Sequence, residues 1–311
     1  MSADQPEALH VVALTGGVGG TRLVDGLDRA LPEGALIIIV NTGDDFAHWG
    51  LHISPDLDTV MYTLAGLSPE ERGWGIEGDT FQVLEEAERR GADAWFRLGD
   101  RDLMTHVLRS RTLAAGESLT QATAELCKGL GVTRSILPMS DSPRPTTIVT
   151  SSGDKMAFQD WLVRARAVPR VRRVEHGGTT APASEVMEAL RWADLVVICP
   201  SNPYVSIDPI LSLDGVRQVL RERLTVAVSP ILAGEAVKGP LASMIVQLEG
   251  QPASAQQVAA HYEDSLDGFV VQEGDAFAAT FPLLETNILI QTQQDRVVLA
   301  YQLLDFARRL R

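Results

Sequence analysis

Residues 10–40, HVVALTGGVGGTRLVDGLDRALPEGALIIIV, contain in order a strand, a glycine-rich loop, a helix and a second strand. Residues 10–14 and 36–40 are continuous apolar runs, a pattern typical of strands buried on both faces of a parallel sheet. Between them, residues 21–31 carry leucine and alanine at helical spacing, and the PEG turn that follows ends the helix. The stretch therefore predicts the opening of a βαβ unit.

The rest of the chain adds more elements of both kinds. The apolar runs Leu195–Cys199 and Leu224–Val228 predict two further buried strands, each followed by a loop and a helix. The middle of the chain is mostly helical in pattern from 56 to 127. Shorter strand-like runs follow it at Val132–Met139, Thr146–Thr150 and Lys155–Phe158.

These elements predict an α/β fold with a Rossmann-like, doubly wound and mostly parallel sheet, interrupted by an inserted helical and β substructure. No long linker rich in Pro, Ser or Gly divides the chain, so we expect a single unit over 1–311. We assign the α/β core to about 8–60 and 185–311. The inserted region is assigned to about 61–184.

The charge balance excludes one class of partner. The chain has 311 residues, with 27 Lys and Arg against 41 Asp and Glu, for a net charge of −14. Such an excess of negative charge repels nucleic-acid backbones, so we expect no nucleic-acid partner. A small phosphorylated ligand is not excluded, because backbone donors, a few arginines and a metal ion can reverse the charge inside a pocket.

The cysteine content and the N-terminal residues indicate in which cellular compartment the protein is expected. Cys127 and Cys199 are the only two cysteines, which excludes a disulfide framework and a thiolate zinc site. The first ten residues, MSADQPEALH, lack the basic and apolar regions of a secretory leader. No apolar run approaches the roughly 20 residues that cross a membrane. We therefore expect a cytoplasmic protein with no membrane partner.

Four glycines, Gly16, Gly17, Gly19 and Gly20, separate the first strand from the helix. A loop without side chains lets the backbone approach an anion and directs N–H groups at it, and the helix dipole adds partial positive charge. The loop lacks the Lys-Ser/Thr pair of a Walker A motif, and Arg22 stands in place of the third glycine of a dinucleotide fingerprint. Its position in a first βαβ unit favours phosphate binding over a tight turn used only for packing.

Four aspartates fall within fifteen residues around the carboxyl end of the second strand: Asp44, Asp45, Asp56 and Asp58. Crowded carboxylates repel one another unless a cation offsets their charge. Mg²⁺ binds one or two carboxylates together with phosphate oxygens, so we predict Mg²⁺ ligands among these acids. A solvated turn is the alternative for the first pair, and helix capping is the alternative for Asp58.

A third polar segment, LGDRDLMTH, begins at Leu98. Arg101 lies between two aspartates at the predicted start of a helix, and His106 follows about one turn later, so the group could form a pocket wall. The alternatives are a structural ion pair for Arg101 and a packed or surface position for His106. The arginines further along this half of the chain suit solvated helix faces rather than a basic groove; they are Arg109, Arg111, Arg164 and Arg166.

The two later strands both end in small polar residues and proline. Ser201 and Asn202 lie between Pro200 and Pro203 after the first of these strands, and a Ser-Pro pair follows the second. Open α/β sheets bind ligands at the carboxyl ends of their strands, so these donors favour a nucleotide crevice over ordinary turns. The chain has no GxSxG elbow, no HExxH and no kinase catalytic loop.

Together these segments resemble one known family, the 2-phospho-L-lactate transferases (CofD, or FbiA in actinobacteria). The resemblance runs in order from Leu14 to about Lys238 and fades beyond it. It rests on the motifs GGVGGTRLVDGL, NTGDD, GLHISPDLDTVMYTLAGL, GWGIEGDTF, LGDRDLMTHVLRS, LPMSDSP, FQDW, PSNPYVSI and AVSPI.

The resemblance implies an enzyme of deazaflavin coenzyme F-420 biosynthesis. Such an enzyme transfers a phospho-carboxylate unit from a guanosine diphosphate adduct to the terminal ribityl hydroxyl of FO, an 8-hydroxy-5-deazaflavin, and releases GMP. It requires Mg²⁺ and is usually a homodimer with a Rossmann-like core. The unit is phospholactate, phosphoenolpyruvate or phosphoglycerate, and the sequence leaves the choice open.

The matching motifs also imply residue roles. The guanosine phosphates would lie beside the glycine loop and the PSNP segment, at Gly16, Gly17, Gly19, Gly20, Thr21, Ser201, Asn202 and Pro203. FO would contact Asp58, Arg101 and His106. Candidate metal ligands are Asp44, Asp45 and Asp56, and candidates for activating the hydroxyl are Asp45 and Asp58, with the division of roles left open. FO is planar and could stack on Trp49, Trp74 or Trp161, although core packing is the simpler expectation for each.

Two rival functions share parts of this pattern. A nicotinamide-dependent dehydrogenase would have the same βαβ opening, but Arg22 in place of the third glycine argues against it. A non-catalytic nucleotide-binding regulator of the related gluconeogenesis or morphogenesis-factor group would share the glycine loop and crevice, without needing the SPDLDTVMYTLAG and GDRDLMTH segments. For the transferase, we expect Asp58→Ala to abolish transfer and to leave the fold intact.

Overall fold

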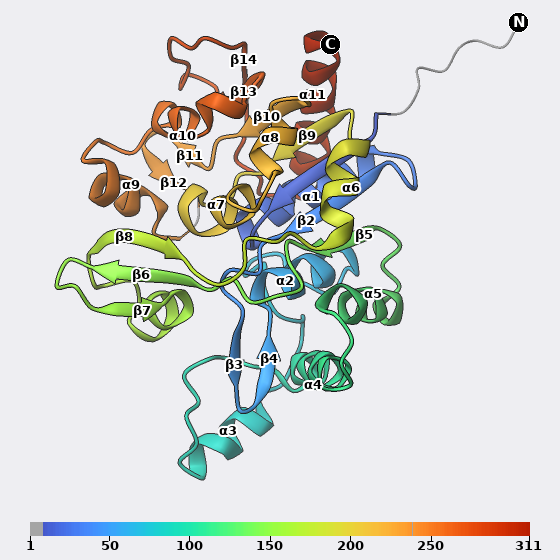
Figure 1. Cartoon of the computed structure of the whole chain (residues 1–311), viewed down its shortest axis with the longest axis vertical. Helices are drawn as coiled ribbons and strands as arrows, with labels where there is room; N and C mark the ends of the chain where they lie inside the picture. The colour runs from blue at the N-terminus through green and yellow to red at the C-terminus, as the bar shows by residue number, and fades with distance from the viewer. Residues whose placement is uncertain (1–8, 238) are drawn as a thin grey trace, which may run out of the picture.

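The computed structural model describes residues 9–237 and 239–311 (Figure 1). The expectation that the chain carries no leader rests mainly on residues 1–8, which lie outside the described part. Within that part, no helix combines the length and the apolar character needed to cross a bilayer.

The centre of the fold is a sheet of seven strands that are all paired in parallel. Its order is β14-β13-β10-β9-β1-β2-β5. Because the chain winds outward from β1 in one direction and then in the other from β9, the order reverses between these two strands, as in a doubly wound Rossmann-type sheet. This confirms the predicted fold class. The strands are β1 (Val11–Thr15), β2 (Leu36–Val40), β5 (Ser135–Pro138), β9 (Leu195–Ile198), β10 (Leu224–Val228), β13 (Gly268–Gln272) and β14 (Leu283–Thr286).

Helices cover both faces of this sheet, which explains why its strands are apolar throughout. In β1, Val11 and Ala13 pack into one core, whereas Val12 and Leu14 pack into the other. The first core includes α1 (Val18–Ala30), α2 (Pro55–Leu64), α5 (Leu119–Leu130) and α11 (Gln293–Leu310). The second includes α6 (Ser184–Trp192), α7 (Asp208–Leu211), α8 (Val216–Leu220), α9 (Leu241–Glu249) and α10 (Ala255–Tyr262).

Two excursions extend beyond the sheet and its helices (Figure 1). The first carries the hairpin β3 (Phe46–His48) and β4 (Leu51–Ile53), and later α3 (Gln82–Arg89) and α4 (Asp100–Ala114). The second is an antiparallel sheet of order β7-β6-β8. A π-helical turn, η1, lies between β7 and β8 along the chain. The elements of this excursion are β6 (Thr146–Thr150), β7 (Lys155–Ala157), η1 (Asp160–Arg164) and β8 (Val171–His176).

The remaining short elements are the π-helical turn η2 (Pro203–Ile207) after β9, the hairpin β11 (Ile231–Leu232) and β12 (Glu235–Ala236), and the 3₁₀ turn η3 (Glu263–Ser265). The hairpin follows β10, so both η2 and the hairpin continue from carboxyl ends of central strands.

One strand that we expected in the insertion belongs to the central sheet. The predicted inserted region of 61–184 contains β5, yet β5 pairs in parallel with β2 from Ile37 opposite Ser135 to Val40 opposite Pro138. The sequence of a four-residue strand does not identify the strand with which it pairs. It therefore could not show whether β5 belongs to the edge of the main sheet or to a separate sheet. The wider division into core and inserted region stays a prediction.

The C-terminal helix α11 is packed tightly against α1. A Cβ atom on Gly26 of α1 would lie 2.1 Å from the carbonyl oxygen of Arg296, so only glycine allows this approach. Arg296 is 6% exposed, and its Nη1 lies 2.9 Å from Asp25 Oδ2. It also pairs with Glu70, in the loop after α2. The helix that carries the glycine loop is therefore held in place from the far end of the chain.

Candidate active site

A cavity of about 660 Å³ opens at the carboxyl ends of β1 and β9, where the order of the sheet reverses. This volume lies within the usual range for small-molecule sites, about 300–1,000 Å³. Its walls come from the start of α1, the loop after β9, the segment before and within α2, α4, and the turn after β7. The site thus lies where an open α/β sheet is expected to bind ligands.

The glycine loop and the loop after β9 meet along one wall of this cavity. The backbone N–H of Gly16 donates to Ser201 Oγ at 3.1 Å. A Cβ on Gly20 would lie 2.2 Å from Thr15 Oγ1 and 2.3 Å from Ser201 Oγ, so the two loops touch only because position 20 has no side chain. Gly17 is the N-cap of α1 and provides no side-chain cap, which leaves the first N–H groups of the helix open to a ligand.

The predicted nucleotide-binding residues divide into two groups. Gly17, Gly19, Ser201 and Asn202 line the cavity. The others support this wall: Thr21 donates to the Gly17 carbonyl at 2.8 Å, and Gly16, Gly20 and Pro203 lie behind the lining residues. Their roles toward a nucleotide stay predictions.

Two of the clustered aspartates face the cavity together. The side-chain amide of Asn41 donates to Asp44 Oδ1 at 3.0 Å and to Asp56 Oδ2 at 2.9 Å. Its amide oxygen accepts from the Gly43 N–H at 2.8 Å, which fixes the orientation of the amide. Gln159, from the turn after β7, donates to Asp44 Oδ2 at 2.7 Å. Both aspartates line the cavity, so two carboxylates are held side by side at its edge.

Burial disfavours the charged forms of Asp44 and Asp56, as their raised pKa values show. Burial raises the pKa of Asp56 to about 7. Burial, together with the nearby charges of Asp56 and Asp45, raises the pKa of Asp44 well above its ordinary value. A divalent cation would remove this penalty, and one or two carboxylates completed by phosphate oxygens are the ligand set that Mg²⁺ prefers. The residues present therefore fit such an ion.

Asp45 lies outside the cavity lining. Its Oδ2 accepts from Ser54 Oγ at 2.7 Å and lies 3.0 Å from His52 Nε2. Burial raises the pKa of this carboxyl group. The geometry gives Asp45 a role in joining the loop after β2 to β4 and the start of α2. Its predicted metal and catalytic roles stay predictions.

Asp58 faces a buried arginine. Nη1 of Arg109 donates to Asp58 Oδ2 at 3.1 Å, and Nη2 of Arg109 contacts Asp58 Oδ1. Arg109 is fully buried, so its predicted place on a solvated helix face is wrong. The capping alternative for Asp58 is also wrong, because the N-cap of α2 is Ser54 and Asp58 lies inside the helix. Asp58 still lines the cavity, and its predicted roles in catalysis and FO binding stay predictions.

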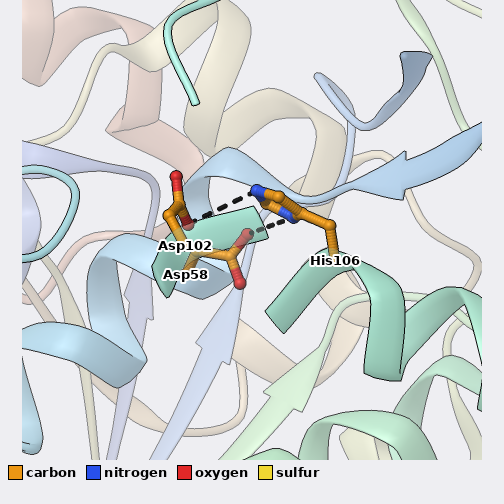
Figure 2. A group of neighbouring side chains, drawn as sticks. All are labelled: Asp58, Asp102 and His106. Atoms are coloured by element: carbon orange, nitrogen blue, oxygen red, sulfur yellow. Dashed lines mark ion pairs between the residues drawn. The ribbon is translucent and has the colours of Figure 1, made fainter. Parts of the chain in front are cut away.

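His106 faces two acids with its two ring nitrogens, as Figure 2 shows. Its Nδ1 lies 3.5 Å from Asp58 Oδ2, and its Nε2 lies 3.3 Å from Asp102 Oδ1. Tyr62 donates its hydroxyl to Asp102 Oδ1 at 2.7 Å. All four side chains line the cavity, and the predicted contact of His106 with FO stays a prediction.

Among the residues predicted to contact FO, Arg101 is the one that does not line the cavity. It is exposed at the start of α4, with Nη1 3.3 Å from the Glu77 carbonyl oxygen. Arg97, four residues earlier, lines the cavity instead. Contact of Arg101 with FO stays a prediction.

The three tryptophans differ in their surroundings. Trp74 lines the cavity and is 37% exposed, with the Arg72 guanidinium 4.8 Å from its ring centroid. Trp161 is buried in the core, as the packing alternative predicts. Trp49 stacks on His48 with ring centroids 4.8 Å apart and lies outside the cavity lining.

Sequence reasoning missed three residues that shape the site: Asn41, Tyr62 and Gln159. Each lies inside a motif that we quoted, NTGDD, PDLDTVMYTLAG or FQDW. The signal available was therefore the motif as a whole, and the residues that stood out within it were the charged ones.

Comparison with known proteins agrees with this geometry. The family model "2-phospho-L-lactate transferase CofD" matches residues 11–298. A 2-phospho-L-lactate transferase from Methanosarcina mazei is 42% identical over 267 residues, covering 85% of this chain and 88% of that protein. A phosphoenolpyruvate transferase from Thermobifida fusca is 42% identical over 283 residues, covering 86% of this chain and 88% of that protein.

A solved structure with the same fold is a UPF0052-family protein from Bacillus halodurans. It superposes with a TM-score of 0.58 at 19% identity and covers 88% of this chain and 82% of that one. At this identity the likeness concerns the fold alone.

Proposed function

Because the chain belongs to the CofD family of 2-phospho-L-lactate transferases, we propose that it transfers a phospho-carboxylate unit from a guanosine diphosphate adduct to the ribityl hydroxyl of FO. The reaction releases GMP and forms a phosphodiester in the biosynthesis of coenzyme F-420. The unit is phospholactate, phosphoenolpyruvate or phosphoglycerate. Relatives named for two of these units are equally identical to the chain, so identity does not choose among them.

The observation that carries the proposal is the combination of two features in one cavity. Backbone N–H groups at the start of α1 face the cavity, and the carboxylates of Asp44 and Asp56 line it as well, with that of Asp56 next to Gly17. Phosphoryl-type transfer depends on positioning and on neutralising charge at the phosphate oxygens, and this cavity offers groups for both.

The cysteines favour direct transfer without a covalent intermediate. Cys127 and Cys199 are buried, and neither lines the cavity. Burial raises the pKa of each thiol to about 12, so neither offers a thiolate at neutral pH. The hydroxyl of FO would therefore attack the phosphorus of the adduct itself.

Different residues of the chain would then bind the adduct and FO. N–H groups of Gly17, Val18 and Gly19 would bind phosphate oxygens of the adduct, with Ser201 and Asn202 beside them. Trp74 and Phe96 would cover the planar ring of FO, for which an apolar wall is favourable.

Asp44 and Asp56 would hold Mg²⁺, with Asn41 and Gln159 fixing their orientation. When bound there, the ion would neutralise charge that builds up on the transferred phosphate. From the resemblance, we also propose a homodimer that works in the cytoplasm, which light scattering and fractionation would test.

The direct test incubates the protein with FO, Mg²⁺ and each of the three guanosine diphosphate adducts, and follows the products by mass spectrometry. A phosphodiester of FO together with GMP is expected from one adduct and would name the donor. Binding of FO without product from any adduct would contradict the assigned donors. No binding of FO, measured by its fluorescence, would contradict the function itself and favour a nucleotide-binding regulator.

Removal of Mg²⁺ with EDTA is expected to lower the rate of transfer at least a hundredfold, because the phosphate charge and the acid pair then face each other without a counter-ion. Adding Mg²⁺ in excess should restore the rate, and adding Na⁺ at equal ionic strength should not. Product formation that continues unchanged in EDTA would contradict the metal role.

Gly20→Ala is expected to weaken GDP binding at least tenfold and to lower stability by about 1–3 kcal/mol, because the added methyl group pushes apart the loops after β1 and β9. Titration calorimetry and urea unfolding measure the two effects. Gly129→Ala is the matched control: position 129 lies within α5 with open space around it, so stability should rise by about 0.5–1 kcal/mol with GDP binding unchanged. Unaltered GDP affinity in Gly20→Ala would place the nucleotide elsewhere.

A further inference from the structure

The cluster of Asp58, Asp102 and His106 has the composition of a metal site, but its two acids approach different nitrogens of the imidazole. Its ligand-type atoms lie within 4.8 Å of one another. A chelate through one imidazole nitrogen needs both carboxylates close to that nitrogen. Here Asp58 Oδ2 lies 3.5 Å from Nδ1, whereas Asp102 Oδ1 lies 3.3 Å from Nε2 (Figure 2). Each acid therefore approaches a different nitrogen, which is unfavourable for an ion shared by all three side chains.

The neighbours of His106 determine which nitrogen carries its hydrogen. Nη1 of Arg109 lies 3.3 Å from Nδ1, and a guanidinium nitrogen can only donate. In the tautomer in which Nδ1 accepts from this nitrogen, Nε2 carries the hydrogen. Among the described residues, Nε2 has no hydrogen-bond partner, since its contact with Asp102 is poorly aligned. His106 is only 2% exposed, so this donor lies buried and unsatisfied beside the cavity that the ring lines.

Asp102 presents the complementary acceptor. Its Oδ1 receives the hydroxyl of Tyr62, and burial raises the pKa of that phenol well above its ordinary value, so Tyr62 remains a donor. Its Oδ2 receives no hydrogen bond from any residue in the described ranges and points away from the imidazole in Figure 2. Because Asp102 lines the cavity, this oxygen is available to a ligand.

The other carboxylates around the cavity are engaged differently. Both oxygens of Asp58 contact Arg109, and both oxygens of Asp44 accept amide hydrogens. Asp56 shares Asn41 with Asp44 and belongs to the pair assigned to the cation. Asp102 is thus the cavity carboxylate that combines a free oxygen with a neighbouring N–H donor.

We propose that Asp102 and His106 form the site for the attacking hydroxyl, and that Asp102 is the base that accepts its proton. A hydroxyl both accepts and donates, so His106 Nε2–H would donate to its oxygen while its proton points to Asp102 Oδ2. In the transfer, the hydroxyl oxygen bonds to phosphorus, the bond from phosphorus to the GMP oxygen breaks with its electron pair left on GMP, and the proton passes to Asp102. This assignment rests on the proposed function and replaces Asp58 and Asp45 as bases.

Asp102→Asn is the first test. The variant keeps the shape of the side chain and one oxygen acceptor but removes the base, so kcat should fall 10²–10⁴-fold. Affinity for FO, measured by fluorescence titration, should change less than tenfold. Asp100→Asn is the matched control on the same helix: Asp100 accepts from the backbone N–H groups of Gln82 and Val83 and does not line the cavity, so kcat should stay within threefold of wild type.

Two variants of His106 give a second test, which distinguishes a role of the Nε2 hydrogen from a purely structural role of the side chain. The amide nitrogen of glutamine can occupy the place of Nε2, whereas that of asparagine occupies the place of Nδ1. His106→Gln should therefore retain at least tenfold more kcat than His106→Asn, at similar melting temperatures. Equal losses in the two variants would overturn the role of the Nε2 hydrogen.

The outcomes separate this inference from the proposed function. If the wild-type protein forms the phosphodiester and Asp102→Asn does so at a similar rate, Asp102 is not the base and only this inference fails. If Asp102→Asn loses Mn²⁺ affinity as strongly as Asp44→Asn, Asp102 is a metal ligand and the inference is again overturned. If wild type forms no product with any adduct, the proposed function and the inference fail together.

Discussion

Replacing Asp58 with alanine is expected to lower the free energy of unfolding by about 3–5 kcal/mol, because the change leaves the guanidinium of Arg109 buried without its counter-ion. Arg109 is fully buried, and Asp58 is its one carboxylate partner within the described residues. This corrects our expectation from sequence that Asp58→Ala would leave the fold intact. Urea unfolding measures the change.

The double variant Asp58→Ala, Arg109→Met identifies the cause. Removing the charge together with its partner should recover at least half of the lost stability, since the methionine can fill the space with apolar groups. Asp93→Ala is the control: it breaks the exposed ion pair with Arg164, 2.6 Å long, and should cost less than about 1 kcal/mol. A loss below 1 kcal/mol in Asp58→Ala would show that the pair does not hold α2 against α4.

Asp56→Asn is expected to reduce the rate of transfer about 10³-fold or more and, at the same time, to stabilise the protein without its metal. The rate falls because the cation loses a ligand. The stability rises because the pKa of Asp56 is about 7 in the folded protein and 3.8 in its ordinary state. Between these values the folded protein holds a proton that the unfolded chain has released, so the stability of the wild-type protein falls as pH rises.

The advantage of Asp56→Asn should therefore be absent below about pH 4, grow as pH rises to about 7, and then level off at up to roughly 4 kcal/mol. Urea unfolding in EDTA at pH 4.5, 6 and 8 measures this profile, with activity measured in Mg²⁺. Asp305→Asn, which removes an exposed acid from α11, is the control and should show no such profile. A pH-independent difference would contradict the raised pKa of Asp56.

The fold was predictable because its strands are apolar on both faces. The runs HVVAL, LIIIV, LVVIC and LTVAV became β1, β2, β9 and β10, and the glycine loop lies where the sheet order reverses. The place of β5 was not predictable, since pairing between distant strands leaves no mark in a run of four residues. The start of α1 differs from the predicted Thr21 only because the last glycines of the loop already belong to the helix.

The site was harder to predict because α4 buries a polar face. Its buried residues are Asp102, Thr105, His106, Arg109 and Thr112, spaced three to four apart as an apolar stripe would be. Reasoning from hydrophobicity assigns such a face to solvent, which is why Arg109 was misplaced. The spacing itself was the usable signal. Polar residues at the helical spacing of a buried face break the usual hydrophobic pattern, and such breaks are expected at functional sites.

The contact between α1 and α11 sets a constraint on the timing of synthesis. Asp25 and Arg296 lie 271 positions apart, yet the glycine loop depends on the helix that this pair helps to hold. A ribosome adds residues at about 5–20 per second, so α1 waits many seconds after its own synthesis for α11 to emerge. During that interval α1 can pack on β1, β2 and α2, but the surface around Gly26 that α11 covers stays open.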